Sequence, residues 1–396
     1  MTDEMINMRD VPGCNSIIRV LGVGGAGSNA VNYMYSAGIA GVDFMVCNTD
    51  AQALEASPVP VRLQLGTTLT EGLGAGNDPE RGKQAALENI NDIKNILEGA
   101  RMLFITAGMG GGTGTGAAPV IADLARKMDI LTIAVVTVPA IVEGQKRFNQ
   151  AIEGVKKLEP VVDSMLVINN LKLQKIYGKL PASVAFRKAD NVICTAVKGV
   201  AEIITLHGNI NIDFADVKTV LSGSKVFLMG TGAALGEERA MTALEEALHS
   251  PMLDSSDIHG AKDILLNIVS GADEITMDEV GKIIDTMQAK AGVDANIIWG
   301  TGFDSRLEHQ ISITVIATRF DRNPSYFLQP EPEPIVIKAP PPVEPLFPPD
   351  NSRTAQNPVP TPEPAPNEGT SGGGMFDGIK KIFGKLVKAP EDQNFK

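Results

Sequence analysis

The chain has 396 residues, a hydrophobic fraction of 43% and a formal net charge of −12 at pH 7. It is long enough for two ordinary domains with tails, and no apolar run approaches the ~20 residues that a membrane-spanning helix needs. The negative charge argues against extensive nucleic-acid binding, because a phosphate backbone must be met by clustered Lys and Arg. Residues 1–15 are polar, lack the pattern of a signal peptide and are expected to be a disordered tail of a cytoplasmic protein.

Neither the cysteines nor the histidines are spaced like metal ligands. Cys14, Cys47 and Cys194 stand alone with no C-x-x-C pair, and the four histidines are scattered. Zinc sites and disulfide frameworks use recurring spacings, so the sequence predicts no protein-built metal site and no disulfide.

The first part of the chain alternates two kinds of segment. Short runs that are apolar on both faces are followed by longer amphipathic stretches such as 79–97, 117–128 and 144–158, which are expected to be helices. The apolar runs, each expected to be a buried parallel strand, are IIRVLGVG, VDFMVCNTD, RMLFITAGMG, LTIAVVTVP and SMLVINN. This βαβ alternation predicts a doubly wound α/β domain with a parallel sheet over residues 16–180.

A long central helix and a second domain are expected next. Residues 181–206 carry apolar positions at helical spacing, and a helix of that length spans ~35 Å, enough to run from one domain into another. The runs KVFLMGTG, DILLNIVSG, NIIWGTGF and ISITVIATRF then alternate with helical stretches at 237–249 and 276–290. They predict a smaller α/β or α+β domain over residues 207–328.

Beyond residue 328 the composition changes abruptly. Residues 329–374 are rich in proline and poor in core-forming residues, so they are expected to be a disordered linker. Residues 375–396 again carry apolar residues at helical spacing, with lysines between them. A short basic amphipathic helix of this kind is typical of a segment that docks on a partner protein or lies on a membrane surface.

Two glycine-rich loops follow predicted strands. In the first, Gly22, Gly24 and Gly27 form a G-x-G-x-x-G pattern, and Asp50 follows the second strand at the distance expected of a ribose-binding acid. Alone, this pattern indicates a NAD(P)-binding oxidoreductase, and that interpretation remains the alternative.

The second loop, GMGGGTGTGAAP at residues 108–119, favours a nucleoside triphosphate. Consecutive glycines let backbone N–H groups close around phosphate oxygens, the threonine hydroxyls add donors, and the following helix adds its dipole. A dinucleotide needs only one such loop. No G-x-x-x-x-G-K-[ST] motif occurs, which excludes a P-loop enzyme.

Four motifs together resemble the FtsZ family, the bacterial and archaeal relatives of tubulin in cell division. They are NTDAQAL (48–54), GLGAGNDPERG (72–82), GGGTGTG (110–116) and NIDFADV (211–217), and the similarity runs in order from about Ile17 to Phe320. The resemblance implies a tubulin-like, Rossmann-type GTPase domain, GTP or GDP as cofactor with Mg²⁺ on its phosphates, and assembly of the chain with copies of itself.

Carried over motif by motif, the resemblance also implies roles for individual residues. Gly112 to Gly114 would grip the phosphates, the loop 74–78 would lie near the γ-phosphate, and Glu143 and Arg147 would meet the ribose and phosphates. Phe186 would stack on the base, while Asn169 and Asp190 would read the guanine edge. The full set of nucleotide-binding residues is Gly24, Gly25, Ala26, Gly27, Ser28, Asn29, Asn48, Asp50, Gly74, Ala75, Gly76, Asn77, Asp78, Gly110, Gly111, Gly112, Thr113, Gly114, Thr115, Gly116, Glu143, Arg147, Asn169, Phe186 and Asp190.

The role of Asp190 also makes chemical sense without the family. A carboxylate can accept hydrogen bonds from both N1–H and the 2-amino group of guanine, whereas adenine offers no such pair. Without the resemblance, Asp190 would be read as a solvated helix residue and Phe186 as a core residue. Two loops depart from the family pattern, AIVEG after VTVP and INNLKL after the last strand of the first domain, and both flank the expected positions of the ribose and base.

The segment NINIDFADV begins like an exposed strand and then breaks its alternation. Hydrolysis of GTP needs an oriented water, and Asp213 and Asp216, with Asn211 as a hydrogen-bonding partner, are the candidates for orienting it. They follow the long helix, which places them at the end of the domain away from the glycine loops. The resemblance implies that they complete the site of the next molecule in a head-to-tail polymer; the alternative is a solvated loop after a helix.

Partners and location follow from the same resemblance. The chain is expected to form filaments of a cytoplasmic, mid-cell division ring at the inner face of the membrane; a tubulin-like filament for DNA segregation or cell shape is the other interpretation. Residues 375–396 occupy the place of the family's anchor-binding tail with a different sequence. They are expected to bind a membrane-anchor or division protein in preference to the membrane surface.

Overall fold

A computed structural model describes residues 16–206, 208–250 and 258–320 of the chain. The expected tail at 1–15, the linker at 329–374 and the amphipathic segment at 375–396 lie outside these described residues. The strands are β1 (Ile18–Val23), β2 (Asp43–Asn48), β3 (Val61–Gln64), β4 (Met102–Gly108), β5 (Leu131–Val138), β6 (Ser164–Asn169), β7 (Lys225–Ala234), β8 (Asp263–Ser270), β9 (Asn296–Phe303) and β10 (Ile311–Thr318). The helices are α1 (Gly24–Ala37), α2 (Ala51–Glu55), α3 (Thr67–Thr70), α4 (Pro79–Glu88), α5 (Ile90–Leu97), α6 (Thr113–Lys127), α7 (Gln145–Leu158), α8 (Asn170–Tyr177), α9 (Ala182–Thr205), α10 (Phe214–Leu221), α11 (Arg239–Leu248) and α12 (Met277–Ala291), with 3₁₀ turns η1 (Ile141–Glu143), η2 (Glu159–Val161) and η3 (Ser305–Leu307).

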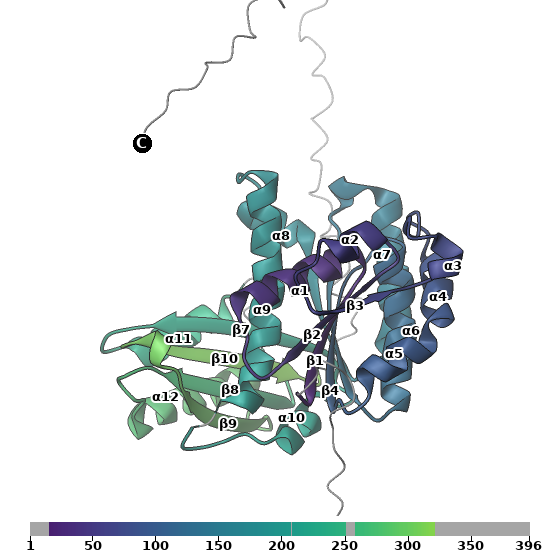
Figure 1. Ribbon diagram of the computed structural model, residues 1–396. Coiled ribbons are helices and arrows are strands. Elements are labelled where there is room, and N and C mark those ends of the chain that lie inside the picture. The colour runs from purple at the N-terminus through teal and green to yellow at the C-terminus, as the bar shows by residue number, and fades with distance from the viewer. Residues whose placement is uncertain (1–15, 207, 251–257, 321–396) are drawn as a thin grey trace, which may run out of the picture. The chain divides into compact units, whose positions relative to one another are not determined.

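The first six strands form a parallel sheet that contains the five expected strands and one that was not predicted, β3. Their order, β3-β2-β1-β4-β5-β6, is that of a doubly wound Rossmann-type fold. Strands β1, β2, β4, β5 and β6 are largely buried on both faces because helices cover both sides (Figure 1), whereas the edge strand β3 is only partly buried. Ile18 and Val20 of β1 pack on the side of α1 and α9, whereas Leu21 and Val23 pack on the side of α4 to α7. The run of apolar residues without alternation therefore reflects burial on both faces.

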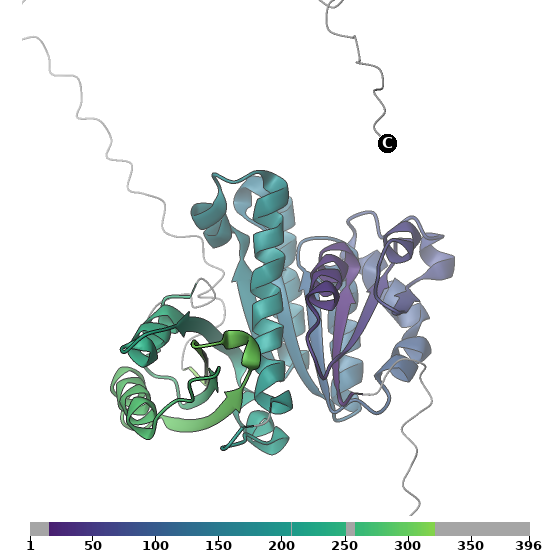
Figure 2. The same ribbon diagram turned by 60° about the vertical axis from the view of Figure 1, so that its left-hand side comes forward.

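The long helix α9 joins the two halves of the described chain. It has 24 residues and passes between the parallel sheet and the second sheet, as Figure 2 shows. Its buried side chains, among them Val197 and Val200, share one core with Val20 of the first half and with Phe227 and Leu265 of the second. Because one core serves both halves, α9 connects them as a packed element.

The second half is a mixed sheet in the order β7-β10-β8-β9, continuous with β6 through two residue pairs with β7. Strand β10 runs antiparallel to both of its neighbours, and β8 and β9 are parallel. A separate core forms where Leu244 of α11 and Ile283 of α12 pack against Ile264 and Ile313 of the sheet. This arrangement confirms the expected second α/β unit.

Three expectations about local structure were wrong. The helix expected at 79–97 is two helices, because Asn89 leaves helical geometry and its Oδ1 accepts a hydrogen bond from Gly66 N at 2.8 Å. Helix α6 begins at Thr113 and so includes glycines expected to lie in the loop. The segment from 208 to 213 is irregular and leads into α10, with no strand. Among the described residues, none of the helices combines the length and apolarity that crossing a bilayer requires.

Candidate nucleotide-binding site

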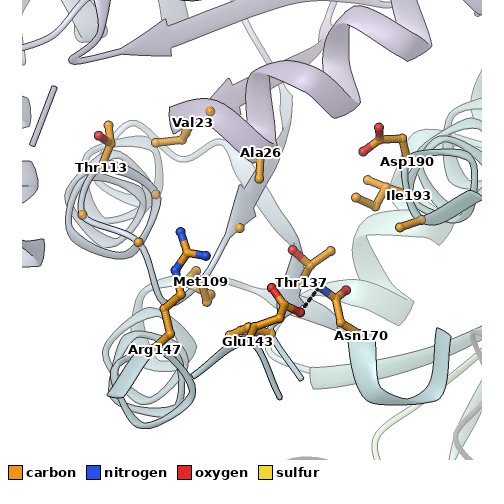
Figure 3. Close-up of a pocket in the computed structure, with 17 residues that line it drawn as sticks. Val23, Ala26, Met109, Thr113, Thr137, Glu143, Arg147, Asn170, Asp190 and Ile193 are labelled. Carbon is orange, nitrogen blue, oxygen red and sulfur yellow. Dashed lines mark hydrogen bonds between the residues drawn. The ribbon is translucent and has the colours of Figure 1, made fainter. Parts of the chain in front are cut away.

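The two glycine loops meet at one point of the sheet. They follow β1 and β4, which are neighbours although they are not consecutive, and the chain winds outward in opposite directions from this pair. Ligands of doubly wound folds bind at such a switch point, beyond the carboxyl ends of the strands. A cavity of about 320 Å³ lies there, lined by Val23, Gly25, Ala26, Gly108, Met109, Gly111, Gly112, Thr113, Gly114, Thr137, Pro139, Glu143, Arg147, Asn170, Ala189, Asp190 and Ile193 (Figure 3).

One end of the cavity suits a polyphosphate. Helices α1 and α6 both start at the cavity, so their free backbone N–H groups and positive dipole ends face the same space. Gly24 has φ +72°, and a Cβ on it would lie 2.9 Å from Gly114 N, so the close approach of the two loops requires glycine. The guanidinium group of Arg147 points into the cavity from α7 (Figure 3).

Hydrogen bonds join the loops around this end of the cavity. Thr49 Oγ1 lies 2.7 Å from Thr113 Oγ1, both buried, which links the loop after β2 to the start of α6. Gly110 N donates to Thr115 Oγ1 at 2.8 Å. Gln150 Nε2 donates to Asn77 O and to Gly111 O, each at 3.2 Å, and so ties the 74–78 loop to the second glycine loop.

The opposite end of the cavity carries hydrogen-bonding side chains beside apolar ones. Asp190 faces the cavity from α9 next to Ile193 (Figure 3). Burial raises the pKa of Asp190 to about 6. Asn170 Nδ2 donates to Glu143 Oε1 at 3.2 Å, and Glu143 also accepts from Ala140 N at 2.9 Å. The carboxylate of Asp190 therefore lies on one wall of the cavity, and the amide of Asn170 lies on another.

Two buried polar atoms near the site have no partner within the chain. Among the described residues, Ser28 Oγ of α1 and Asn170 Oδ1 at the cavity wall are buried without a hydrogen bond. Buried polar groups are normally satisfied, and Asn170 lines the cavity, so its unpaired Oδ1 points to a ligand that supplies the missing donor; Ser28 lies outside the lining. A nucleotide fits this requirement. The described residues contain no group of three or more His, Cys, Asp or Glu side chains arranged to hold a metal ion.

The structure brings some of the predicted residues to the cavity wall and leaves others around it. The predicted residues that line it are Gly25, Ala26, Gly111, Gly112, Thr113, Gly114, Glu143, Arg147 and Asp190. Those outside the lining are Gly24, Gly27, Ser28, Asn29, Asn48, Asp50, Gly74, Ala75, Gly76, Asn77, Asp78, Gly110, Thr115, Gly116 and Asn169. The side chain of Phe186 lies outside the described part of the structure. Lining residues that were not in the predicted set are Val23, Gly108, Met109, Thr137, Pro139, Asn170, Ala189 and Ile193; of these, Gly108 and Met109 belong to the second glycine loop.

Three polar residues outside the lining cap helices. Asp50 accepts from Ala53 N at 3.1 Å, Asp78 from Glu80 N at 2.9 Å, and Asn169 from Leu171 N at 2.9 Å. These bonds fix where α2, α4 and α8 begin. Contact of these three residues with a nucleotide stays a prediction, and the neighbouring Asn170 is the amide that lines the cavity.

The paired acids start α10. Asp216 N donates to Asp213 Oδ1 at 2.9 Å, and Asp213 N donates to Asp216 Oδ2 at 3.2 Å, which is a capping box. Asn211 Oδ1 accepts from Gly208 N at 2.8 Å and closes the segment before them. The acids therefore have partners within their own chain, and Asp213 remains exposed.

The acids lie far from the cavity of their own molecule. The Arg101 guanidinium lies 5.0 Å from the ring centroid of Phe214, at the start of α10. Arg101 precedes β4, whereas Gly108 ends β4 and lines the cavity. Seven strand residues span ~23 Å, so the two features occupy opposite ends of the sheet.

The fold and the cavity define a nucleotide-binding protein of the doubly wound α/β class with a second domain attached by a long helix. A family model described as "Tubulin/FtsZ family, GTPase domain" matches residues 17–178, and one described as "FtsZ family, C-terminal domain" matches residues 226–321. The cell division protein FtsZ of Coxiella burnetii is 47% identical over 305 residues, covering 77% of this chain and 79% of the relative. The corresponding protein of Buchnera aphidicola is 46% identical over the same length.

Solved structures agree with this result. An empty FtsZ dimer from M. jannaschii is 40% identical, with a TM-score of 0.71, and covers 77% of this chain and 88% of its own. CetZ1 from Haloferax volcanii, solved as a GDP-bound monomer, has a TM-score of 0.68 at 18% identity over 78% of this chain and 96% of its own, and shows the shared fold. The chain belongs to the FtsZ family and carries its GTPase domain. The alternative of a NAD(P)-binding oxidoreductase is not favoured.

Proposed function

We propose that this chain is a GTP-hydrolysing protein of cell division that polymerises head to tail, and that each GTPase site is completed by the next subunit. The observation that carries the proposal is the separation between the cavity and the acids. Asp213 and Asp216 are at one end of the sheet, and the nucleotide cavity is at the other. A single molecule therefore holds both halves of the site but cannot bring them together.

GTP and GDP fit the cavity with the phosphates at the starts of α1 and α6. There the helix N-termini and Arg147 offset the negative charge. Asp190 would accept from N1–H and the 2-amino group of guanine, with the amides of Asn169 and Asn170 nearby. We expect Mg²⁺ to accompany the triphosphate and to take most of its ligands from phosphate oxygens and water, as is usual in nucleotide sites.

The acids would orient the attacking water in the neighbouring subunit's site. Phosphoryl transfer to water depends on positioning and on charge neutralisation. Asp213 and Asp216 would supply the hydrogen-bond acceptors for that water, and Asn211 would hold the segment through its bond to Gly208. A contact between two different surfaces of the same chain does not close on itself when it repeats by translation, and it produces a filament.

Exposed apolar side chains at both ends of the sheet support such a contact. Near the cavity, Leu73 is 84% exposed and Val142, next to Glu143, is 74% exposed. Near the acids, Phe303 is 58% exposed and Ile210 is 38% exposed. Exposed apolar groups gathered at one place are typical of interaction surfaces. Among the solved relatives, FtsZ of M. jannaschii was determined as a dimer and CetZ2 of Haloferax volcanii as a GTPγS-bound protofilament.

The experiment that tests the shared site is turnover as a function of protein concentration. GTP hydrolysis per subunit should be negligible in dilute protein and should rise steeply at the concentration where protein begins to pellet with GTP. Turnover per subunit that does not depend on protein concentration would show that one molecule suffices and would overturn the proposal.

In the cell, these filaments would form the division ring in the cytoplasm, at the inner face of the membrane. Imaging a tagged copy in dividing cells checks this location: a ring at mid-cell is expected, and filaments elsewhere would indicate DNA segregation or cell shape as the role. Residues 375–396, which lie outside the described structure, would connect the ring to a membrane-anchor or division protein. Salt-sensitive co-sedimentation of that peptide with anionic liposomes would instead indicate direct membrane binding.

A further inference from the structure

The segment that carries the acids is fastened to the second domain at two places. Thr301 N donates to Ile210 O at 2.8 Å, and Ile210 N donates to Thr301 Oγ1 at 3.2 Å, so β9 holds the middle of the segment. The second attachment is a side-chain bond, in which Asn209 Nδ2 donates to Glu274 Oε1. These contacts join residues 208–213 to strand β9 and to the loop between β8 and α12.

The turn that presents Glu274 is itself fixed. Arg239 is only 8% exposed, and its guanidinium donates to Asp273 O and to Glu274 O, each at 3.0 Å. It also forms an ion pair with Glu279 at 2.9 Å, and Glu279 accepts from Thr276 N at 2.8 Å. The backbone at residues 273–276 is therefore held by Arg239 and by Glu279. The position from which the Glu274 side chain extends is fixed by these bonds.

We propose that Glu274 is a positioning residue for GTP hydrolysis: by accepting from Asn209, it holds the segment 208–213 in the geometry that presents Asp213 and Asp216 to the next subunit. The inference rests on the proposed function of those two acids. Glu274 acts through Asn209 and not on the reacting atoms. A hydrogen bond to a carboxylate is stronger than one between neutral groups, which suits it to fixing an otherwise irregular segment.

The hydrogen bond between Asn209 and Glu274 should affect the geometry of the segment 208–213 more than the stability of the fold. Asn209 and Glu274 are both exposed, and exposed pairs add little to stability. In contrast, a displacement of about 1 Å in a catalytic group can lower a rate about a hundredfold. Loss of the Asn209–Glu274 bond is therefore expected to lower turnover without a matching loss of stability.

A double-mutant cycle tests the inference. The variants are Asn209→Ala, Glu274→Ala and the two together, in the full-length chain, with GTP turnover per pelleted subunit, nucleotide affinity and melting temperature measured for each. Each single change should lower turnover about tenfold, and the double variant should be no slower than the singles, because both remove the same bond. Nucleotide affinity and melting temperature should stay at the unchanged chain's values. Glu274→Gln should recover most of the turnover, since its amide oxygen still accepts from Asn209.

Other results would overturn the positioning role. Losses that multiply in the double variant would mean that the two residues act independently, for example by touching the neighbouring subunit themselves. Full turnover in Glu274→Ala, or a loss of pelleting that accounts for the lost turnover, would also contradict it. Asp278→Ala, which removes another exposed acid from the first turn of α12, is the matched control and should change nothing.

The activities of variants at Asp213 and at Glu274 distinguish a failure of this inference from a failure of the proposed function. If Asp213→Asn and Asp216→Asn both hydrolyse GTP normally, the acids are not catalytic and both proposals fail. If Asp213→Asn is inactive while Glu274→Ala is fully active, the shared site stands and only the role of Glu274 is refuted.

Discussion

Asp213 and Asp216 each accept a hydrogen bond from the other's backbone N–H group, at 2.9 and 3.2 Å. This reciprocal pair forms the start of α10 and holds both carboxylates in a defined geometry at an exposed helix end. The same residues that are candidates for orienting water therefore also stabilise a helix. Any test of their chemistry has to separate these two roles.

Asp213→Asn makes that separation. Asparagine is as good an N-cap as aspartate, so the free energy of unfolding should stay within about 0.5 kcal/mol. The negative charge and part of the acceptor capacity are lost, and turnover should fall by about 10² or more, as for other groups that orient or deprotonate a nucleophile. GTP binding and pelleting should persist. Turnover, filter binding of GTP and sedimentation measure the three properties.

The companion variant Asp213→Ala removes the cap as well. It should lose turnover to the same extent and, in addition, about 1 kcal/mol of stability. If Asp213→Asn keeps full activity while Asp213→Ala loses both activity and stability, the residue is only a helix cap.

Gly112 is a position where a single methyl group should disturb the nucleotide site. A Cβ there would lie 2.9 Å from both Ala75 Cβ and Asp78 N, so Gly112→Ala should push the 74–78 loop away from the second glycine loop. Overpacking of this kind costs about 1–3 kcal/mol, and we expect a lower melting temperature without nucleotide and at least tenfold weaker GTP binding.

The neighbouring Gly111→Ala is the matched control for Gly112→Ala. Nothing lies within 4 Å of a Cβ at that position, so the nucleotide-free protein should keep its melting temperature. Equal destabilisation by both changes would show that loss of glycine flexibility, and not the contact with the 74–78 loop, is responsible.

Much of the first domain was predictable from the sequence because five of its six strands are largely buried on both faces and glycine loops directly follow β1 and β4, whereas the partly buried edge strand β3 was missed. The break at Asn89 and the caps at Asp50, Asp78 and Asn169 were not, because their hydrogen bonds depend on the spacing of particular loops.

Cavity residues such as Thr137 and Asn170 carry no motif of their own. They reach the site only because the sheet continues from β4 to β5 and then to β6, which brings the carboxyl ends of β5 and β6 to the same edge as the second glycine loop. Gln150 of α7, which bonds to both the 74–78 loop and the second glycine loop, was missed because its contacts depend on how α7 packs beside these loops.

Nucleotide affinity should depend on pH through Asp190. Burial raises the pKa of this carboxyl from 3.8 to about 6 in the nucleotide-free protein. Hydrogen bonds from guanine stabilise the ionised form and lower its pKa in the complex, so binding releases a proton when the pH is below about 6. Affinity should therefore be constant above pH 7 and about tenfold weaker at pH 5.

The γ-phosphate also titrates in this range, so the measurement is a comparison of binding curves from pH 5 to 8 for the unchanged chain and Asp190→Asn. The variant should bind more weakly at pH 7 and show a smaller dependence on pH. An identical pH dependence in both proteins would show that Asp190 does not meet the base in its ionised form.

The ion pair of Arg239 and Glu279 should make stability depend on pH in a different window. Hydrogen bonds from Arg239 lower the pKa of Glu279 from 4.5 to about 2. Because the folded-state pKa lies below the unfolded one, the pair contributes its full stability above about pH 4.5 and loses it as the pH falls towards 2. Glu279→Gln leaves Arg239 buried without its counter-charge, so it should lower the free energy of unfolding by about 2 kcal/mol at pH 7 and by much less at pH 3.

Urea unfolding at the two pH values measures the effect of Glu279→Gln, and Asp123→Asn is its control. Lys127 and Asp123 form an ion pair at 2.6 Å, but the two side chains are 71% and 46% exposed. Water screens this pair, so its loss should change the free energy of unfolding by less than about 1 kcal/mol at either pH. The Arg239 pair is only 10% and 17% exposed, and burial is therefore the property that should separate the two results. Equal losses for both variants at pH 7, or a loss for Glu279→Gln that is as large at pH 3, would mean that Glu279 stabilises the fold by packing and not by its charge.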